Sequence, residues 1–176
     1  VVTLDVDLSY EPRHIGLMLE KLRETRAQVV LASPYMKGGR ISNVPWLRRM
    51  LSIWANRFLS LFAPGRLSTL TCMVRAYEGD FIRGLVLRAT GLEVMPETVY
   101  KTMIMRGRIA QVPAHLDWSR QLAAGAKRRS STRIGRQMIG TLLSGFIFRP
   151  FMFFILPGLL LLAFAIWTNV WMFIHF

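Results

Sequence analysis

The feature that most constrains this chain is the distribution of its charged residues, which stop abruptly before the C-terminal segment. All 23 lysines and arginines and all 10 aspartates and glutamates lie at or before Arg149, and residues 151–176 contain none. A helix rises about 1.5 Å per residue, so a run of this length reaches across a hydrocarbon core of roughly 30 Å. A domain this small has nowhere to bury so many apolar residues. We therefore expect residues 150–176 to form a C-terminal transmembrane segment behind a polar domain.

The basic residues ahead of the apolar run predict the side of the membrane on which the polar domain lies. The net charge is +13, and six cations precede the run: Lys127, Arg128, Arg129, Arg133, Arg136 and Arg149. The positive-inside rule then places the domain on the cytoplasmic side. Lys127, Arg128 and Arg129 are expected to face lipid headgroups. Nucleic acid is disfavoured as a partner, because the cations gather beside the apolar run and no nucleic-acid-binding module is recognisable.

Two aspartates end the first apolar stretch. Residues 1–7 read VVTLDVD, a run of strand formers that closes with Asp5 and Asp7. Side chains two apart on a strand share a face, so both carboxylates can converge just past the strand, at the edge where open α/β sheets bind ligands. Such oxygen donors suit Mg²⁺ or Mn²⁺ shared with substrate phosphates. The alternative is that both are simply polar residues ending an edge strand. The single cysteine, Cys72, excludes an internal disulfide framework.

The order of apolar patterns predicts an α/β fold. After the opening strand, helical spacing continues to about Arg26, and residues 28–32 form a short apolar run typical of a buried strand. Strand, helix and strand within so few residues indicate a βαβ unit and a parallel core. Further strands are predicted at 67–74 and, at an edge because of Pro113, at 108–113. Pro96 is expected to start a helix whose buried face carries Val99, Tyr100, Met103 and Ile104.

A long helix over residues 46–62 carries the most suggestive polar pattern. Arg48, Ser52 and Asn56 are four residues apart and therefore form one stripe, opposite many apolar side chains. The stripe is either a solvated face or, beside a membrane, a phosphate grip, since guanidinium and hydroxyl groups both donate hydrogen bonds. Before this helix, residues 33–40 form a glycine-containing loop whose cations Lys37 and Arg40 could face phosphate, or which is an ordinary surface turn. Residues 133–149 have the pattern of an amphipathic helix at the membrane surface.

Taken in order, these features resemble family 2 glycosyltransferases, in particular the branch that transfers mannose or glucose to polyprenyl (dolichyl) phosphate. The motifs that carry the resemblance are spread over nearly the whole chain. They are Leu4-Asp5-Val6-Asp7 with Pro12, Val29-Val30, Ser33-Pro34-Tyr35, Lys37-Gly38-Gly39, Arg48 with Ser52 and Asn56, Thr71, Arg75-Ala76-Tyr77, Glu97, Val112-Pro113, Arg120 and Arg149-Pro150.

The resemblance implies a partial type-A glycosyltransferase fold, Rossmann-like with a mixed, mainly parallel sheet. It implies that Asp5 and Asp7 bind the Mg²⁺ or Mn²⁺ that bridges the diphosphate of a GDP- or UDP-hexose. It also implies that Arg48, Ser52 and Arg120 hold the phosphate of a polyprenyl phosphate acceptor, with Lys37 and Arg40 near the donor phosphates. Lastly, Glu97 is implied to face the transferred sugar and, with Asp7, to be catalytic.

These expectations divide the chain into three parts. Residues 1–132 are expected to be the C-terminal part of a catalytic domain, 133–149 the interfacial helix and 150–176 the membrane segment. The family's nucleotide-base half is expected to precede Val1, and Ser9 stands where the family often has a third metal contact. The function expected is metal-dependent, inverting transfer of a hexose to polyprenyl phosphate. The alternatives are an inactive or non-catalytic membrane-tethered phosphate-binding module, and a family 2 enzyme that uses another lipid or a polysaccharide acceptor.

Overall fold

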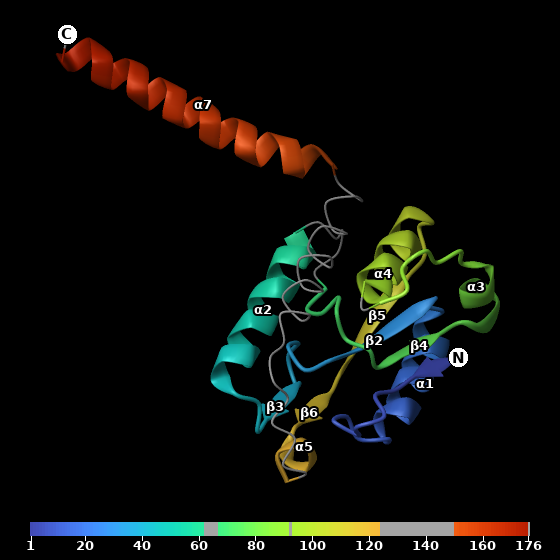
Figure 1. The fold of residues 1–176 in the computed structure, drawn as a ribbon. Helices are drawn as coiled ribbons and strands as arrows, with labels where there is room; N and C mark the ends of the chain where they lie inside the picture. Colours follow the sequence, from blue (N-terminus) through green and yellow to red (C-terminus); the bar gives the residue numbers. More distant parts are fainter. Residues whose placement is uncertain (62–66, 92, 124–149, 176) are drawn as a thin grey trace.

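A four-stranded mixed sheet forms the centre of the polar domain in the computed structural model, which describes residues 1–61, 67–91, 93–123 and 150–175. Its strand order is β1 (Val2–Thr3), β4 (Arg75–Tyr77), β2 (Val29–Ser33) and β5 (Ile109–Pro113) (Figure 1). The pairings of β4 with β1 and β2 are antiparallel, whereas β2 and β5 run parallel, with Val30 opposite Ala110. The strand predicted at 108–113 therefore exists and lies at a sheet edge, as its proline required.

A second, two-stranded parallel sheet lies beside the first. It pairs β3 (Arg40–Ser42) with β6 (His115–Asp117), and Ile41 is opposite Leu116. An isolated bridge between Tyr10 and Leu116 ties the segment after the two aspartates to β6. This small sheet was not predicted, because its strands have three residues each, too few for a periodic pattern to be visible.

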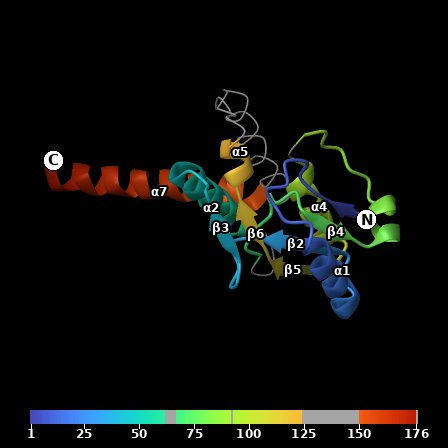
Figure 2. The same cartoon turned by 90° about the horizontal axis from the view of Figure 1, so that it is seen from below.

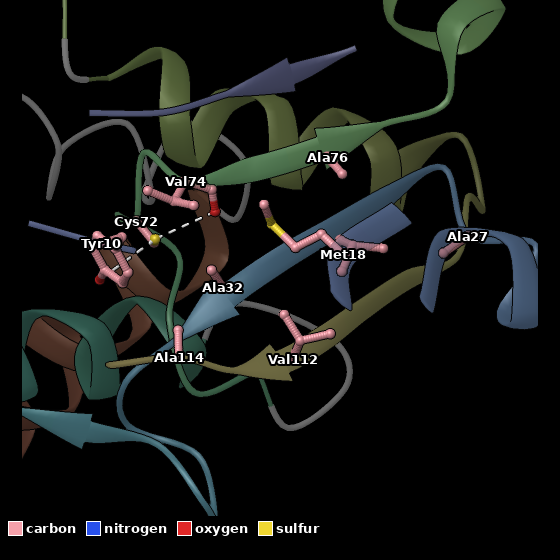
Figure 3. Packing of buried hydrophobic residues seen from close by; sticks show 10 residues of the cluster. Tyr10, Met18, Ala27, Ala32, Cys72, Val74, Ala76, Val112 and Ala114 are labelled. Atoms are coloured by element: carbon pink, nitrogen blue, oxygen red, sulfur yellow. Dashed lines mark hydrogen bonds between the residues drawn. The ribbon is translucent and has the colours of Figure 1, made fainter. Parts of the chain in front are cut away.

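Helices cover both faces of the central sheet. Helix α1 (His14–Thr25) packs on one face, where Met18 belongs to one buried cluster with Val30 and Ala32 of β2 and with Cys72 (Figure 3). The alternate side chains of β2 point to the other face. There they meet α4 (Val94–Ile104) and the C-terminal half of α2 (Trp46–Leu61). Figures 1 and 2 both show α1 and α2 on opposite sides of the strands. The predicted α/β layering is thus confirmed.

The sheet is less parallel than predicted. Among the described residues, two of the four strand pairs are parallel and two are antiparallel. β1 and β2 do run in the same direction with α1 between them in sequence, as a βαβ unit requires. However, β4 inserts between them and is antiparallel to both. The insertion of β4 cannot be predicted from the βαβ segment, because β4 comes later in the chain and does not affect the sequence pattern of that segment.

The strand predicted at 67–74 is wrong in its bounds. The structure places a strand only at Arg75–Tyr77, and the residues before it form an irregular loop. Asn56 on α2 holds this loop, because its buried side-chain oxygen accepts hydrogen bonds from Leu70 N at 2.8 Å and from Thr69 Oγ1 at 3.3 Å. It also accepts from the backbone N–H and the hydroxyl of Thr71. Thr69 and Thr71, which the sequence predicted to lie in a strand, instead donate hydrogen bonds to the side chain of Asn56.

Arg75 is fully buried and fastens the same loop from the other side. Its Nε donates to the carbonyl of Cys72 at 2.6 Å and its Nη2 to that of Leu70 at 2.5 Å. Its Nη1 donates to the carbonyl of Met95 in α4, at 2.6 Å. Burial lowers the pKa of this guanidinium, although an arginine remains charged. One side chain therefore joins the loop before β4 to the start of α4.

The C-terminal helix α7 spans Pro150–His175 and contains Pro157 without interruption. Within it, Pro157–His175 is long and apolar enough to cross a membrane and is not buried against the rest of the chain. This matches the expected membrane segment. The predicted interfacial helix at 133–149 and the headgroup-facing residues Lys127, Arg128 and Arg129 lie outside the described residues. Two short helices, α3 (Gly79–Gly84) and α5 (Ser119–Ala123), are the remaining helices of the part of the chain that the structure describes.

Candidate functional site

Asp5 and Asp7 lie in a turn directly after β1. The N–H of Leu8 donates to the carbonyl of Asp5 at 3.3 Å, and the N–H of Ser9 donates to Oδ1 of Asp7 at 3.1 Å. Leu8 has a φ of 52°, in the left-handed region that a side chain of its size rarely adopts. Strain of this kind is typical of functional loops. The structure therefore places both aspartates just past the end of the strand, as predicted, whereas the convergence of their carboxylates on one metal ion stays a prediction.

A buried tyrosine and cysteine lie behind this turn. The Sγ of Cys72 is 3.8 Å from the hydroxyl of Tyr10 (Figure 3). Burial raises the pKa of both groups, and the nearby charge of Asp5 adds to the rise. A thiol with a raised pKa is a poor nucleophile, so Cys72 has a structural role.

Tyr35 extends this group of side chains to α2. Its hydroxyl donates to Oγ of Ser52 at 2.6 Å, and burial raises its pKa, as does its proximity to Cys72. Because Ser52 Oγ accepts a hydrogen bond from Tyr35, its own O–H can point elsewhere and donate to a ligand. Ser52, one of the predicted acceptor residues, is thus held by a side chain from the loop after β2. The segment after the Asp5–Asp7 turn is tied to β6, because the N–H of Asp117 donates to the carbonyl of Ser9 at 2.9 Å.

Arg48 lies one helical turn before Ser52 and packs against an aromatic ring. Its guanidinium carbon is 5.2 Å from the centroid of the Trp118 ring. Trp118 follows β6 directly, and Arg120 comes two residues later, exposed in the short helix α5. Among the predicted acceptor residues, Arg48 and Ser52 therefore lie on adjacent turns of α2, and Arg48 contacts a tryptophan that is two residues before Arg120.

The loop with Lys37 and Arg40 follows β2. Both side chains are exposed. Gly39 is required here, because a Cβ at this position would come within 2.6 Å of the Pro34 carbonyl. Gly38 has a φ of +89°. The tight turn sends the chain into β3, whose first N–H, on Arg40, donates to the carbonyl of Ala114. The role of Lys37 and Arg40 near donor phosphates stays a prediction.

Helix α2 is oriented with its polar stripe toward the domain and its large apolar side chains toward solvent, the reverse of an ordinary amphipathic helix. The polar stripe points inward: Asn56 is buried, and Ser52 is bonded to Tyr35. The large apolar side chains point outward, with Trp46 74% and Trp54 65% exposed. The exposed apolar face of α2 consists of Trp46, Leu47, Met50, Leu51 and Trp54. The interpretation of the stripe as a solvated face is therefore wrong, because the loop 67–72 and Tyr35 supply polar partners for it.

Glu97 is buried at the start of α4 and holds the segment before that helix. Its carboxylate accepts from the N–H groups of Arg88 and Ala89 at 3.0 and 2.9 Å, and Lys101 Nζ lies 2.6 Å from it. Burial alone would raise its pKa, but the bonds from Lys101 and the two N–H groups outweigh that effect and lower it. The contacts described for Glu97 join it to the α3–α4 connection, and its sugar-facing role stays a prediction. The expected buried face of α4 is confirmed at Val99 and Tyr100 but wrong at Ile104, which is 66% exposed.

A Glu97→Gln substitution tests this holding role. We expect it to weaken the bonds to the two N–H groups and to Lys101, and to lower the free energy of unfolding by about 1–2 kcal/mol. The folded-state pKa of Glu97 is depressed, so its contribution is fully present above its ordinary pKa and is lost as the pH falls through the folded-state value. Thermal unfolding at neutral and acidic pH checks both points. Equal stability of the variant and the wild type at neutral pH would contradict the assignment.

Two residues of the candidate site were not predicted from the sequence. Trp118 was seen only as part of a stretch, and Tyr35 only as part of a motif. A tryptophan between an acidic residue and two polar ones, after a strand, is a weak signal, because nothing in the local sequence indicates that a helix seventy residues earlier lies beside it.

Among the described residues, no group of three or more His, Cys, Asp or Glu side chains could hold a metal ion alone. Mg²⁺ sites commonly use one or two carboxylates plus substrate phosphates, and Asp5 with Asp7 fits that donor set.

Comparison with known proteins places the chain among relatives that are glycosyltransferases by name, although no protein-family profile matches it. Over 117 residues it is 31% identical to the undecaprenyl-phosphate mannosyltransferase of Micrococcus luteus, covering 64% of this chain and 47% of that protein. Over 89 residues it is 28% identical to the polyprenol monophosphomannose synthase of Mycolicibacterium smegmatis, covering 51% and 33%. The resemblance inferred from the motifs is confirmed by these homologues. The chain spans about half or less of the length of these relatives.

Proposed function

We propose that this chain belongs to a membrane-bound glycosyltransferase that transfers a hexose from a GDP- or UDP-hexose to polyprenyl phosphate. The names of the two relatives support a mannosyl group and a polyprenyl acceptor. The observation that carries the proposal is the construction of α2. One face of this helix holds Arg48 and Ser52, and another exposes a row of large apolar side chains. Arg48 contacts Trp118, whose neighbour Asp117 binds Ser9, two residues after Asp7. A lipid phosphate matches both faces, because its phosphate can bind Arg48 and Ser52 while its hydrocarbon chain lies against the apolar side chains.

The proposed fold is the sheet and acceptor half of a type-A glycosyltransferase domain. The parallel β2–β5 pair and the strands β1 and β4 would form its Rossmann-like core, and the Asp5–Asp7 turn follows the carboxyl end of β1. Ligands of open α/β sheets bind at such ends. The donor nucleotide would meet the acceptor there, with Lys37 and Arg40 on the neighbouring loop near the donor phosphates.

The proposed reaction forms a bond between an acceptor phosphate oxygen and the anomeric carbon of the hexose, as the bond from that carbon to the nucleotide diphosphate breaks. Attack opposite to the leaving group inverts the anomeric configuration. A phosphate monoester is largely ionised at neutral pH, so no strong general base is required. Arg48, Ser52 and Arg120 would orient this phosphate for attack, which is chiefly a positioning effect.

Asp5 and Asp7 would hold Mg²⁺ or Mn²⁺ at the donor diphosphate. When bound, such an ion neutralises the charge that develops on the leaving diphosphate. The contribution of the protein is the geometry of the turn. The bond from Ser9 N fixes the direction of the Asp7 carboxylate before substrate arrives, and the left-handed Leu8 shapes the backbone of the turn.

Membrane attachment follows from two features of the chain. Helix α7 can cross the bilayer, and the exposed apolar face of α2 can lie in the interface, where tryptophan rings are favoured. The cations Arg49 and Arg57 on α2 are exposed and suit anionic headgroups. Together with the basic residues before the span, they favour an active site on the cytoplasmic side.

Substitution of Arg48 by alanine in the intact protein tests the acceptor site. We expect the KM for polyprenyl phosphate to rise at least about tenfold, because a charge-assisted bond to a phosphate contributes roughly 1.5–3 kcal/mol. The KM for the nucleotide sugar should change little. Steady-state rates with each substrate varied in turn give both values, and Arg23→Ala, at an exposed position of α1, is the control for a lost surface charge. A larger effect on the nucleotide sugar than on the lipid would reassign Arg48 to the donor site.

A further inference from the structure

We infer that Trp118 is a positioning residue for the acceptor phosphate and holds the Arg48 guanidinium against its ring. The inference rests on the proposed function and adds to it a residue outside the motifs that carry the family resemblance. Arg48 and Trp118 are seventy positions apart in sequence and come from different elements, α2 and the segment after β6. Their contact at 5.2 Å falls within the range in which a cation is attracted to an aromatic face.

An indole ring can hold a guanidinium without neutralising its charge, because the attraction comes from the electron density of the ring face and not from an ionic group. Stacking on the ring also fixes the plane of the guanidinium. Arg48 is one turn from Ser52, whose hydroxyl is held by Tyr35. Two aromatic residues from separate loops thus support the two adjacent phosphate-binding groups on α2.

Trp118 also connects the acceptor residues to the aspartate turn. The backbone N–H of Trp118 donates to the carbonyl of Ser42 at 3.3 Å, which fixes Trp118 at the end of the β3–β6 sheet. The preceding residue, Asp117, donates its N–H to the carbonyl of Ser9 at 2.9 Å, two positions after Asp7. The Asp117 side chain accepts from Asn43 at 2.7 Å and from the N–H of Ser119, which starts the helix of Arg120. One short strand end therefore sets the positions of Asp7, Arg48 and Arg120 relative to one another.

A double-mutant cycle between Trp118 and Arg48 tests the inference. The probe is undecaprenyl phosphate, whose equilibrium binding to the intact protein is measured in detergent micelles. Trp118→Leu is expected to weaken binding about fivefold, and Trp118→Phe is expected to restore most of the affinity, because its ring still attracts the cation. In the Arg48→Ala background, Trp118→Leu should cause no further loss. Binding of the nucleotide sugar should remain within about twofold of the wild-type value throughout.

The outcomes separate this inference from the proposed function. If Arg48→Ala weakens lipid binding and Trp118→Leu does not, or if their effects simply add, Trp118 is not the support of Arg48 and the inference is wrong. If Arg48→Ala itself binds undecaprenyl phosphate as the wild type does, the acceptor site of the proposed function is wrong. Should Trp118→Leu fail to fold, Trp118→Met compared with Trp118→Phe makes the same comparison between an aliphatic and an aromatic side chain.

Discussion

Replacement of Asp5 or Asp7 by asparagine is expected to lower the rate of glycosyl transfer by the intact protein at least about 100-fold, because each carboxylate supplies charge that holds the metal at the leaving diphosphate. Asparagine keeps the size of the side chain and, at Asp7, an oxygen that can accept from Ser9 N. The turn should therefore persist while metal binding is lost. Transfer is measured in membranes with Mg²⁺ or Mn²⁺ added, and binding of the lipid acceptor should be unchanged.

Two controls make the aspartate result specific. Asp80→Asn removes an acid from α3, where its partner Arg83 is also exposed, and should leave transfer at the wild-type rate. Treatment of the wild-type protein with a chelator should reproduce the loss caused by Asp5→Asn, and added Mg²⁺ or Mn²⁺ should reverse it. Full activity of both aspartate variants would contradict the metal assignment and favour the alternative that these residues only end a strand.

Substitution of Arg75 by methionine is expected to be the most destabilising single change in the polar domain, at about 3 kcal/mol. The substitution leaves three carbonyl groups, on Leu70, Cys72 and Met95, without the donor that they share. Buried acceptors that lose their partners cost about 1–3 kcal/mol each, partly offset here because a buried charge is removed. Such a loss lowers the unfolding midpoint by roughly 6–12 °C in a protein of this size.

Thermal unfolding of the purified protein measures this effect. Arg83→Met is the matched control, since Arg83 makes an exposed ion pair with Asp80 and surface pairs contribute little. Arg75→Lys should recover only part of the stability, because a single ammonium group cannot reach three carbonyls in the plane of a guanidinium. An Arg75→Met variant that melts with the wild type would show that the loop before β4 does not depend on this side chain.

The sequence predicted the parts of the fold that are local. The helices α1, α2 and α4 have strong periodic patterns, and β2 and β5 are short apolar runs, so each was found within a few residues of its observed bounds. The position of the two aspartates after a strand was also predicted, because it depends only on residues 1–7. The apolar run after Arg149 was sufficient to predict a membrane-crossing helix.

The errors occur where a distant side chain decides the local structure. The segment 67–74 has the composition of a strand, but Asn56 and Arg75 satisfy its backbone groups and prevent it from joining the sheet. The orientation of α2 has the same origin: its polar stripe is internal because Tyr35 and the loop 67–72 provide hydrogen-bond partners. The pairing of Arg48 with Trp118 depends on tertiary structure alone. Sequence patterns describe single elements and do not specify which polar groups meet.

One measurement tests the central claim most directly. The intact protein is expressed in membranes that lack other polyprenyl-phosphate glycosyltransferases, and labelled GDP-mannose, other GDP-hexoses and UDP-hexoses are each supplied with undecaprenyl phosphate. We expect label to enter a lipid that is sensitive to mild acid and contains hexose, phosphate and polyprenol in equal amounts. Formation should require Mg²⁺ or Mn²⁺ and disappear in Asp5→Asn. Absence of this lipid with every donor, or its formation at the wild-type rate by Asp5→Asn, would contradict the account.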